Sequence, residues 1–152
     1  MERYQIEYDV HFGYWYNVLC EKFYARCDLV FNLIQLVGGS AAAAGVVAAK
    51  PVLITASGIM LAVAAAFSLA WQPGIKAERH RQAKDCWLDL KAEMLELTDK
   101  QLVAACARLQ KHETGMTSLN LPAANAAIRS LGHKDGFAEL TAWQRFVQRL
   151  AM

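Results

Sequence analysis

The sequence lacks the short motifs that mark the common enzyme classes. It contains no G-x-x-x-x-G-K-[ST], G-x-G-x-x-G, H-E-x-x-H or G-x-S-x-G, which are the signatures of phosphate loops, dinucleotide sites, zinc proteases and serine hydrolases. Asp85, Asp89 and Glu93 follow one another at four-residue spacing, but exposed helices commonly carry such carboxylates beside basic residues. We therefore expect neither an enzyme nor a bound cofactor.

Metal-ligand spacing is also missing. No two cysteines stand as C-x-x-C, and none pairs with a histidine at the spacing of a zinc site. The cysteines are Cys20, Cys27, Cys86 and Cys106, and the histidines are His11, His80, His112 and His133. We interpret the cysteines as apolar filler in a reducing compartment and predict no metal site.

The sequence also gives no sign of a strongly basic surface. The chain has 16 Lys and Arg against 14 Asp and Glu, without a basic stripe or a nucleic-acid-binding motif, so nucleic acid is not an expected partner. Residues 72–152 hold 12 basic and 9 acidic side chains. This mild positive balance suits the anionic inner leaflet of a membrane.

Charge is absent altogether from two long runs. Residues 29–49 and 52–71 hold no charged side chain over 21 and 20 positions, and about 20 apolar residues in a helix span a hydrocarbon core of ~30 Å. Lys50-Pro51 between them favours a tight turn. We predict a transmembrane hairpin over residues 29–71. The alternative is a buried hairpin in a soluble protein, but the rest of the chain is too short to cover two helices that are apolar all round.

The predicted spans contain a few polar residues and many small ones. Asn32 and Gln35 share a face of the first span, and Thr55 and Gly58 share a small-residue stripe of the second. The amides either bond across helices or line a water-filled pore, and alanine-rich spans of weak hydrophobicity favour a homo-oligomer in the lipid bilayer. The candidate pore-lining or interhelical residues are Asn32, Gln35, Ser40 and Thr55, and the candidate close-packing residues are Gly38, Gly39 and Gly58.

Basic residues flank the hairpin on both sides, whereas its turn carries only Lys50. This distribution places both termini in the cytoplasm. The orientation charges are Lys22, Arg26, Lys76, Arg79, Arg81 and Lys84, and the expected interface anchors are Tyr24 and Trp71. Residues 1–28 have no apolar core of their own, so no cleavable signal peptide is expected there.

Two periods compete in residues 1–28. Apolar and polar residues alternate from Tyr4 to Phe12, as in a strand, while Tyr4, Tyr8, Phe12 and Trp15 also fit one helical face. A strand needs a partner, and the chain has no second strand-like run. We therefore predict an amphipathic helix that runs into the first span and either lies along the membrane surface or packs on the later tail.

Residues 75–152 predict a cytoplasmic helical region. A break at Gln72-Pro73-Gly74 precedes a helix over 75–97, and a capping box at Thr98 and Gln101 starts a helix that runs to about Lys111. Residues 113–121 are typical of a loop, Pro122 opens a helix that Gly132 ends, and an amphipathic helix follows from Phe137 to Leu150. The apolar seam of the first of these helices is Ala83, Trp87, Leu90, Met94 and Leu97. The predicted class is an all-α integral membrane protein with regions 1–28, 29–71 and 75–152.

The segment EKFYARCDLVFNLIQLVGGSAA, the tight hairpin and the charged helix ERHRQAKDCWLDLKAEM carry a resemblance. Through them, residues 15–90 resemble the bacterial SLATT-type proteins, two-transmembrane effectors found beside nucleotide second-messenger defence systems. The resemblance implies that the chain oligomerises and perforates the inner membrane when infection is sensed. No second-messenger sensor is recognisable, so a signalling ligand would bind the helical tail or a sensor protein would deliver the signal.

The leading hypothesis is thus a self-assembling inner-membrane protein that acts as a pore-forming or membrane-disrupting effector. The alternatives are a membrane-anchored scaffold whose cytoplasmic helices recruit a partner, and a phage-derived holin-like lysis protein. An anchor should tolerate leucine at Asn32 and Gln35, whereas a pore should not. Exposure of Trp143 and Phe146 would favour recruitment.

Overall fold

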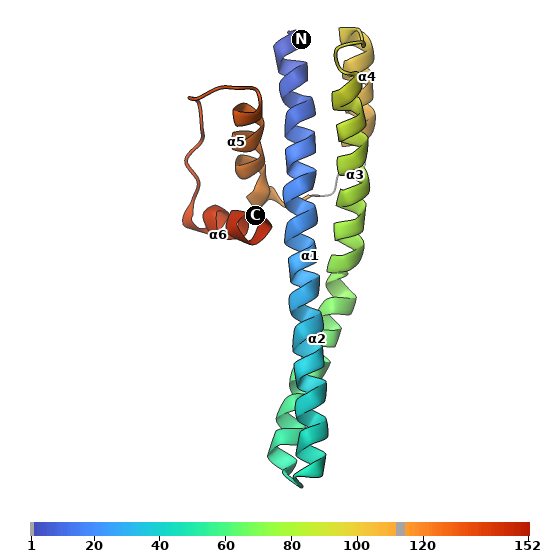
Figure 1. The fold of residues 1–152 in the computed structure, drawn as a ribbon, viewed down its shortest axis with the longest axis vertical. Coiled ribbons are helices and arrows are strands. Elements are labelled where there is room, and N and C mark those ends of the chain that lie inside the picture. Colours follow the sequence, from blue (N-terminus) through green and yellow to red (C-terminus); the bar gives the residue numbers. More distant parts are fainter. Residues whose placement is uncertain (1, 112–114) are drawn as a thin grey trace. The chain divides into compact units, whose positions relative to one another are not determined.

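The computed structural model describes residues 2–111 and 115–152, which form helices with no strand among them (Figure 1). This confirms the all-α prediction and the helix predicted over residues 4–12. Residues 113 and 114 of the predicted loop lie outside the described residues. The helices are α1 (Arg3–Val47), α2 (Pro51–Trp71), α3 (Pro73–Glu93), α4 (Asp99–Gln110), the 3-10 helix η1 (Thr117–Leu119), α5 (Asn120–Ser130) and α6 (Ala142–Ala151).

The chain divides into two compact units. Unit 1 consists of Met1–Phe23 and Ala77–Met152, and unit 2 is Tyr24–Lys76. Helix α1 belongs to both, since it continues from Arg3 to Val47. Residues 2–23 therefore belong to the same compact unit as the C-terminal tail.

Unit 2 is a helical hairpin with a turn at the predicted place. Ala49 takes the left-handed conformation (φ 51°), and the Lys50 N–H donates to the Gly45 carbonyl at 2.9 Å, which closes the end of α1. Pro51 then opens α2, where a missing N–H costs nothing. The break predicted at residues 72–74 is shorter than expected. Only Gln72 leaves the helical conformation (φ 49°), and Pro73 already begins α3.

Two helical stretches are long and apolar enough to cross a membrane, by length and composition. They lie within Arg3–Val46 and Pro51–Glu93, and only 11% of the most apolar window of each is buried. A hairpin covered by the rest of a soluble protein would have most of these side chains buried.

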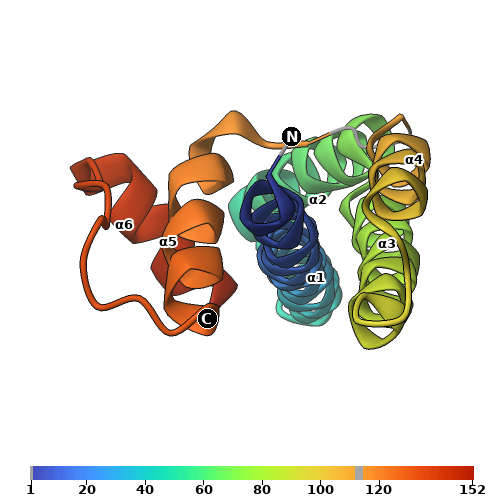
Figure 2. The same cartoon turned by 90° about the horizontal axis from the view of Figure 1, so that it is seen from above.

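The core of unit 1 forms where the first turns of α1 meet α3 and α4. The buried side chains are Ile6, Val10, Trp87, Leu90, Leu102 and Cys106, and Met94, Leu97 and Leu109 pack against them. The predicted apolar seam of α3 therefore faces this core. Figure 2 shows the unit 1 part of α1 between the α3–α4 pair on one side and the α5–α6 pair on the other.

Helix α3 ends at Glu93, four residues before the predicted end at Leu97. Just beyond this end, the Arg3 guanidinium donates to the Leu97 carbonyl at 3.0 Å and also to the Met94 carbonyl. The same guanidinium pairs with Asp99 at 2.9 Å and with Glu7 at 3.0 Å, and these hydrogen bonds raise the pKa of Arg3. The predicted capping box is confirmed, since Gln101 Oε1 accepts from the Thr98 N–H at 3.0 Å.

Helices α5 and α6 start at different residues from those predicted. Helix α5 begins at Asn120, so Pro122 stands inside its first turn rather than at its first position. Helix α6 begins at Ala142 and not at Phe137. The Asn125 side chain holds the preceding segment extended by two hydrogen bonds to Ala138, of 2.8 and 2.9 Å, and Thr141 then caps α6.

The α5–α6 side of unit 1 contacts α1 through polar groups as well as rings. His11 Nδ1 hydrogen-bonds Ser130 Oγ, and the Tyr4 hydroxyl hydrogen-bonds His133 at 3.0 Å. Burial and, secondarily, the charge of Lys91 lower the pKa of His11. The neutral ring is therefore favoured in the folded protein, and its contribution to stability is lost as the pH falls through this lowered pKa.

Cys106 should resist alkylation. Burial and the nearby negative charge of Asp9 raise the pKa of its thiol from 9.0 to about 11, so its thiolate fraction at pH 8 is roughly 100-fold below that of an ordinary thiol. The contribution of the neutral thiol to stability is complete below about pH 9 and is lost as the pH rises through about 11. Peptide mass spectrometry after timed iodoacetamide treatment should find the exposed Cys86 modified first. Equal rates in the folded chain would contradict this, and equal rates in denaturant are the control.

Candidate functional site

Small residues form the seam of the hairpin. Gly38 and Gly45 on α1 and Ser57 and Ala64 on α2 are its buried positions. A Cβ on Gly38 would lie 3.0 Å from Leu61 Cγ, and one on Gly45 would lie 2.9 Å from Ile54 Cγ1. The two helices thus approach more closely than larger side chains would allow.

The other two candidate close-packing residues lie elsewhere. A Cβ on Gly39 or on Gly58 would meet nothing within 4 Å, and both glycines are exposed. Of the three glycines, only Gly38 lies in the seam. Close packing at Gly39 and Gly58 would therefore require another chain.

Gly38→Val should loosen the hairpin, whereas Gly39→Val should not. The valine at position 38 must displace Leu61, and overpacking of this kind costs about 1–3 kcal/mol. The adjacent Gly39 has the same backbone and open space around it, so it is a matched control. Thermal unfolding in detergent, followed by circular dichroism, should show a lower Tm for Gly38→Val alone. Equal Tm values for the two variants would contradict the close packing of Gly38 against Leu61.

Asn32 and Gln35 lie in different surroundings. Asn32 is exposed, and its Nδ2 donates to Asp28 Oδ2 at 3.1 Å. Gln35 is half-buried in an open hollow that Asp28, Ser68 and Gln72 also line. Sequence reasoning missed Asp28, although it is the only acidic residue of unit 2 and lies four and seven residues before the two amides. That spacing places all three on one side of α1.

The hydroxyl groups of the hairpin bond to their own helices. Ser40 donates to the Leu36 carbonyl at 2.9 Å and Thr55 to the Pro51 carbonyl at 3.0 Å. Ser57 donates to the Leu53 carbonyl at 2.6 Å. Such bonds to the preceding turn satisfy a hydroxyl in an apolar environment. Ser40 and Thr55 are exposed, so neither bonds across the hairpin.

The two expected interface anchors lie together. The Tyr24 and Trp71 rings meet edge to face at 5.8 Å, and Phe31 contacts Trp71 at 6.1 Å. Lys76 Nζ lies 5.6 Å from the centroids of both Tyr24 and Trp71, a cation–π arrangement. This cluster gives the end of the hairpin opposite its turn an aromatic and cationic character.

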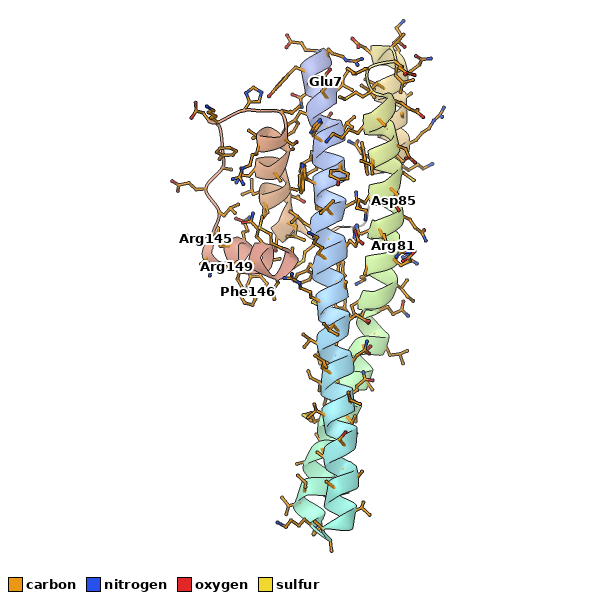
Figure 3. The ribbon with its side chains drawn as sticks, in the orientation of Figure 1. Glu7, Arg81, Asp85, Arg145, Phe146 and Arg149 are labelled. Atoms are coloured by element: carbon orange, nitrogen blue, oxygen red, sulfur yellow. The ribbon has the colours of Figure 1, made fainter. Side chains whose placement is uncertain are left out.

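Two of the remaining orientation charges form ion pairs. Arg81 pairs with Glu78 at 3.2 Å, and the half-buried Lys84 pairs with Glu21 at 2.9 Å. The bond to Glu21 raises the pKa of Lys84. Figure 3 shows Arg81 and Asp85 on α3. The side chains of Lys22, Arg26 and Arg79 are exposed.

A buried polar pair in unit 1 also escaped the sequence analysis. His80 Nδ1 lies 2.8 Å from Asn17 Oδ1, and Asn17 Nδ2 donates to the Gly13 carbonyl at 2.8 Å. The amide therefore offers its oxygen to the ring, and His80 carries its hydrogen on Nδ1. Nothing in the local sequence distinguishes these residues from solvated ones, because their pairing depends on how α3 meets α1.

Across residues 2–111 and 115–152, no group of three His, Cys, Asp or Glu side chains is arranged to hold a metal ion. Comparison with family models, with curated proteins and with solved structures finds no significant match to the chain. We take the hairpin as the candidate site because it carries exposed polar residues on a mostly apolar surface.

Proposed function

We propose that the chain is a membrane protein whose α1–α2 hairpin spans a bacterial inner membrane, with both termini in the cytoplasm. The exposed apolar surface of the hairpin supports this, because such a surface in water would drive aggregation. The Lys and Arg residues on both flanks support the orientation. The resemblance to SLATT-type proteins supports the bacterial setting, as an effector in anti-phage defence, and no enzymatic role is proposed.

Within the membrane, the protein self-assembles and permeabilises the bilayer. The observation that carries this proposal is the exposed Asn32 amide, hydrogen-bonded to the half-buried Asp28, on a predominantly apolar hairpin. Polar groups within a bilayer face a helix bundle or a water-filled cavity, because lipid cannot hydrogen-bond them. The open positions at Gly39 and Gly58 allow neighbouring hairpins to pack closely against one another.

Dye release from liposomes tests the permeabilising role. Wild-type protein should release a trapped fluorophore, and Asn32→Leu/Gln35→Leu should abolish release while inserting normally. Val30→Leu/Val37→Leu is the matched control, because both side chains are exposed on α1 and are already apolar. Leakage that survives the double leucine variant would exclude these amides from the conducting wall. No leakage from inserted wild type under any trigger would leave the hairpin as an anchor.

A second candidate function, recruitment of a partner by a membrane-anchored tail, is favoured by one observation. Trp143 and Phe146 on α6 are 57% and 52% exposed. Such exposure favours recruitment, since paired exposed aromatics commonly mark an interaction surface. If recruitment is the function, Asn32→Leu/Gln35→Leu should bind the partner as well as the wild type does.

A further inference from the structure

The apolar side of α6 is wider than the surface that it buries. Val147 and Ala151 are fully buried, and α6 packs against η1 and α5. Trp143 and Phe146 belong to the same apolar arc of the helix, four residues before Val147 and Leu150 respectively, yet they remain more than half exposed. One edge of the arc thus packs inward and the other is uncovered.

The uncovered edge is held in a fixed shape. The Trp143 and Phe146 rings stack with centroids 5.6 Å apart and planes 30° apart. Trp143 Nε1 donates to Ser118 Oγ at 3.1 Å, which ties the indole to η1. The Thr141–Gln144 capping box fixes the first turn of α6. Binding through these rings would therefore require little ordering of side chains.

Both charged side chains of α6 are basic. Arg145 and Arg149 are exposed, and residues 140–152 contain no acidic side chain. Figure 3 shows Arg145, Phe146 and Arg149 on α6, where Arg149 follows Phe146 by one helical turn. The surface combines two aromatic rings with two guanidinium groups, which bind phosphate oxygens in bidentate fashion.

We propose that this surface, the α6 aromatic face of Trp143, Arg145, Phe146 and Arg149, docks in the headgroup region of a bilayer that contains anionic lipid. The inference rests on the proposed anchoring by the hairpin. In this arrangement the rings enter the boundary between headgroups and acyl chains, while the arginines bind lipid phosphates. Helix α6 would then couple the cytoplasmic unit to the membrane surface.

Two considerations favour lipid over a protein partner. An aromatic ring offers roughly 150–250 Å², so two half-exposed rings present about 200 Å², well below the ~800 Å² that each partner buries in a stable protein interface. A small surface is sufficient for lipid, because the hairpin is joined to unit 1 at both Phe23 and Ala77 and keeps the local concentration of bilayer high. In Figure 1, the unit 1 part of α1 runs past α5 before it reaches the level of α6, so α6 lies toward the end of unit 1 at which α1 leaves.

Quenching of tryptophan fluorescence by brominated phosphatidylcholine tests the proposal on the full-length protein in liposomes. Wild type, Trp143→Phe and Trp71→Phe are compared in vesicles with and without phosphatidylglycerol. The quenchable signal lost with Trp71→Phe reports hairpin insertion, and that lost with Trp143→Phe reports docking of α6. Phenylalanine keeps a ring at each position, and circular dichroism confirms that each variant is folded.

We expect both tryptophans to be quenched, and the Trp143 signal to grow with phosphatidylglycerol. Arg145→Gln and Arg149→Gln should each lower the ratio of docked to undocked α6 by roughly fivefold in anionic vesicles. Arg108→Gln, at an exposed position on α4, should leave the ratio unchanged. Quenching of Trp71 without Trp143 would overturn the docking proposal alone. Absence of both would overturn the membrane anchoring as well, and Trp143 quenching that ignores phosphatidylglycerol would exclude the arginine contacts.

Discussion

Trp87→Ala should lower the free energy of unfolding of unit 1 by about 3–5 kcal/mol, the usual cost of deleting a large buried aromatic side chain. The Trp87 side chain has no exposed surface and is the largest fully buried one in the described chain. It packs against Gly13 of α1 so closely that a Cβ at position 13 would overlap the indole. The contact therefore joins α1 to α3 directly.

Chemical denaturation of the full chain in detergent, followed by far-UV circular dichroism, measures this loss. Leu88→Ala is the control, because the adjacent Leu88 is 47% exposed and its truncation should cost less than about 0.5 kcal/mol. Gly13→Ala should destabilise the wild type but be tolerated once Trp87→Ala has emptied the space. Additive effects of these two substitutions would show that Gly13 and Trp87 are not in contact.

The importance of Trp87 was predictable from the sequence, and that of Gly13 was not. The four- and three-residue steps from Ala83 through Trp87 and Leu90 identify the buried side of α3, because helical periodicity alone determines which residues share a side. Gly13 is needed only because α3 crosses α1 at that position. The crossing depends on tertiary packing, which a single helical pattern does not contain.

In the hairpin too, some features were predictable from the sequence and others were not. The two uncharged runs and Lys50-Pro51 predicted the helices and the turn correctly, since composition and proline geometry act locally. They could not determine which glycines lie in the seam, because Gly38 and Gly39 are adjacent and equally small. Only the rotation of α1 about its axis places Gly38 against Leu61 and leaves Gly39 open.

The predicted helix ends were wrong at two places where a side chain from another part of unit 1 hydrogen-bonds to the backbone. Helix α6 was predicted to begin at Phe137, because apolar residues continue at helical spacing from there. The Asn125 side chain instead holds Ala138 in an extended segment. Arg3 likewise donates to the Met94 and Leu97 carbonyls, in the segment that was predicted to continue α3. Both interactions join residues far apart in the chain, which no local pattern records.

Asn17→Ala should destabilise unit 1 by about 2–4 kcal/mol, because it opens a small cavity and removes the hydrogen-bond partner of a buried ring nitrogen. Asn17 has no exposed surface and His80 is only 6% exposed, so water cannot readily replace the lost amide. The Asn17 side chain also satisfies a second lone pair of the Gly13 carbonyl. The pair therefore connects α1 and α3 through a buried polar contact, in addition to the half-buried Lys84–Glu21 ion pair.

A double-mutant cycle with Asn17→Ala and His80→Ala separates this polar coupling from loss of volume. Either single substitution already removes the hydrogen bond between them, so the double variant should be more stable than the sum of the single losses predicts by about 1–2 kcal/mol. Lys100→Ala combined with Asn17→Ala is the control, since Lys100 is exposed on α4 and should add independently. A coupling energy near zero between positions 17 and 80 would mean that their hydrogen bond does not contribute to joining α1 and α3. A coupling of the expected size would show that this pair helps to fix the axial register of α3 on α1, because apolar seams tolerate sliding whereas a buried hydrogen bond forms at one register only.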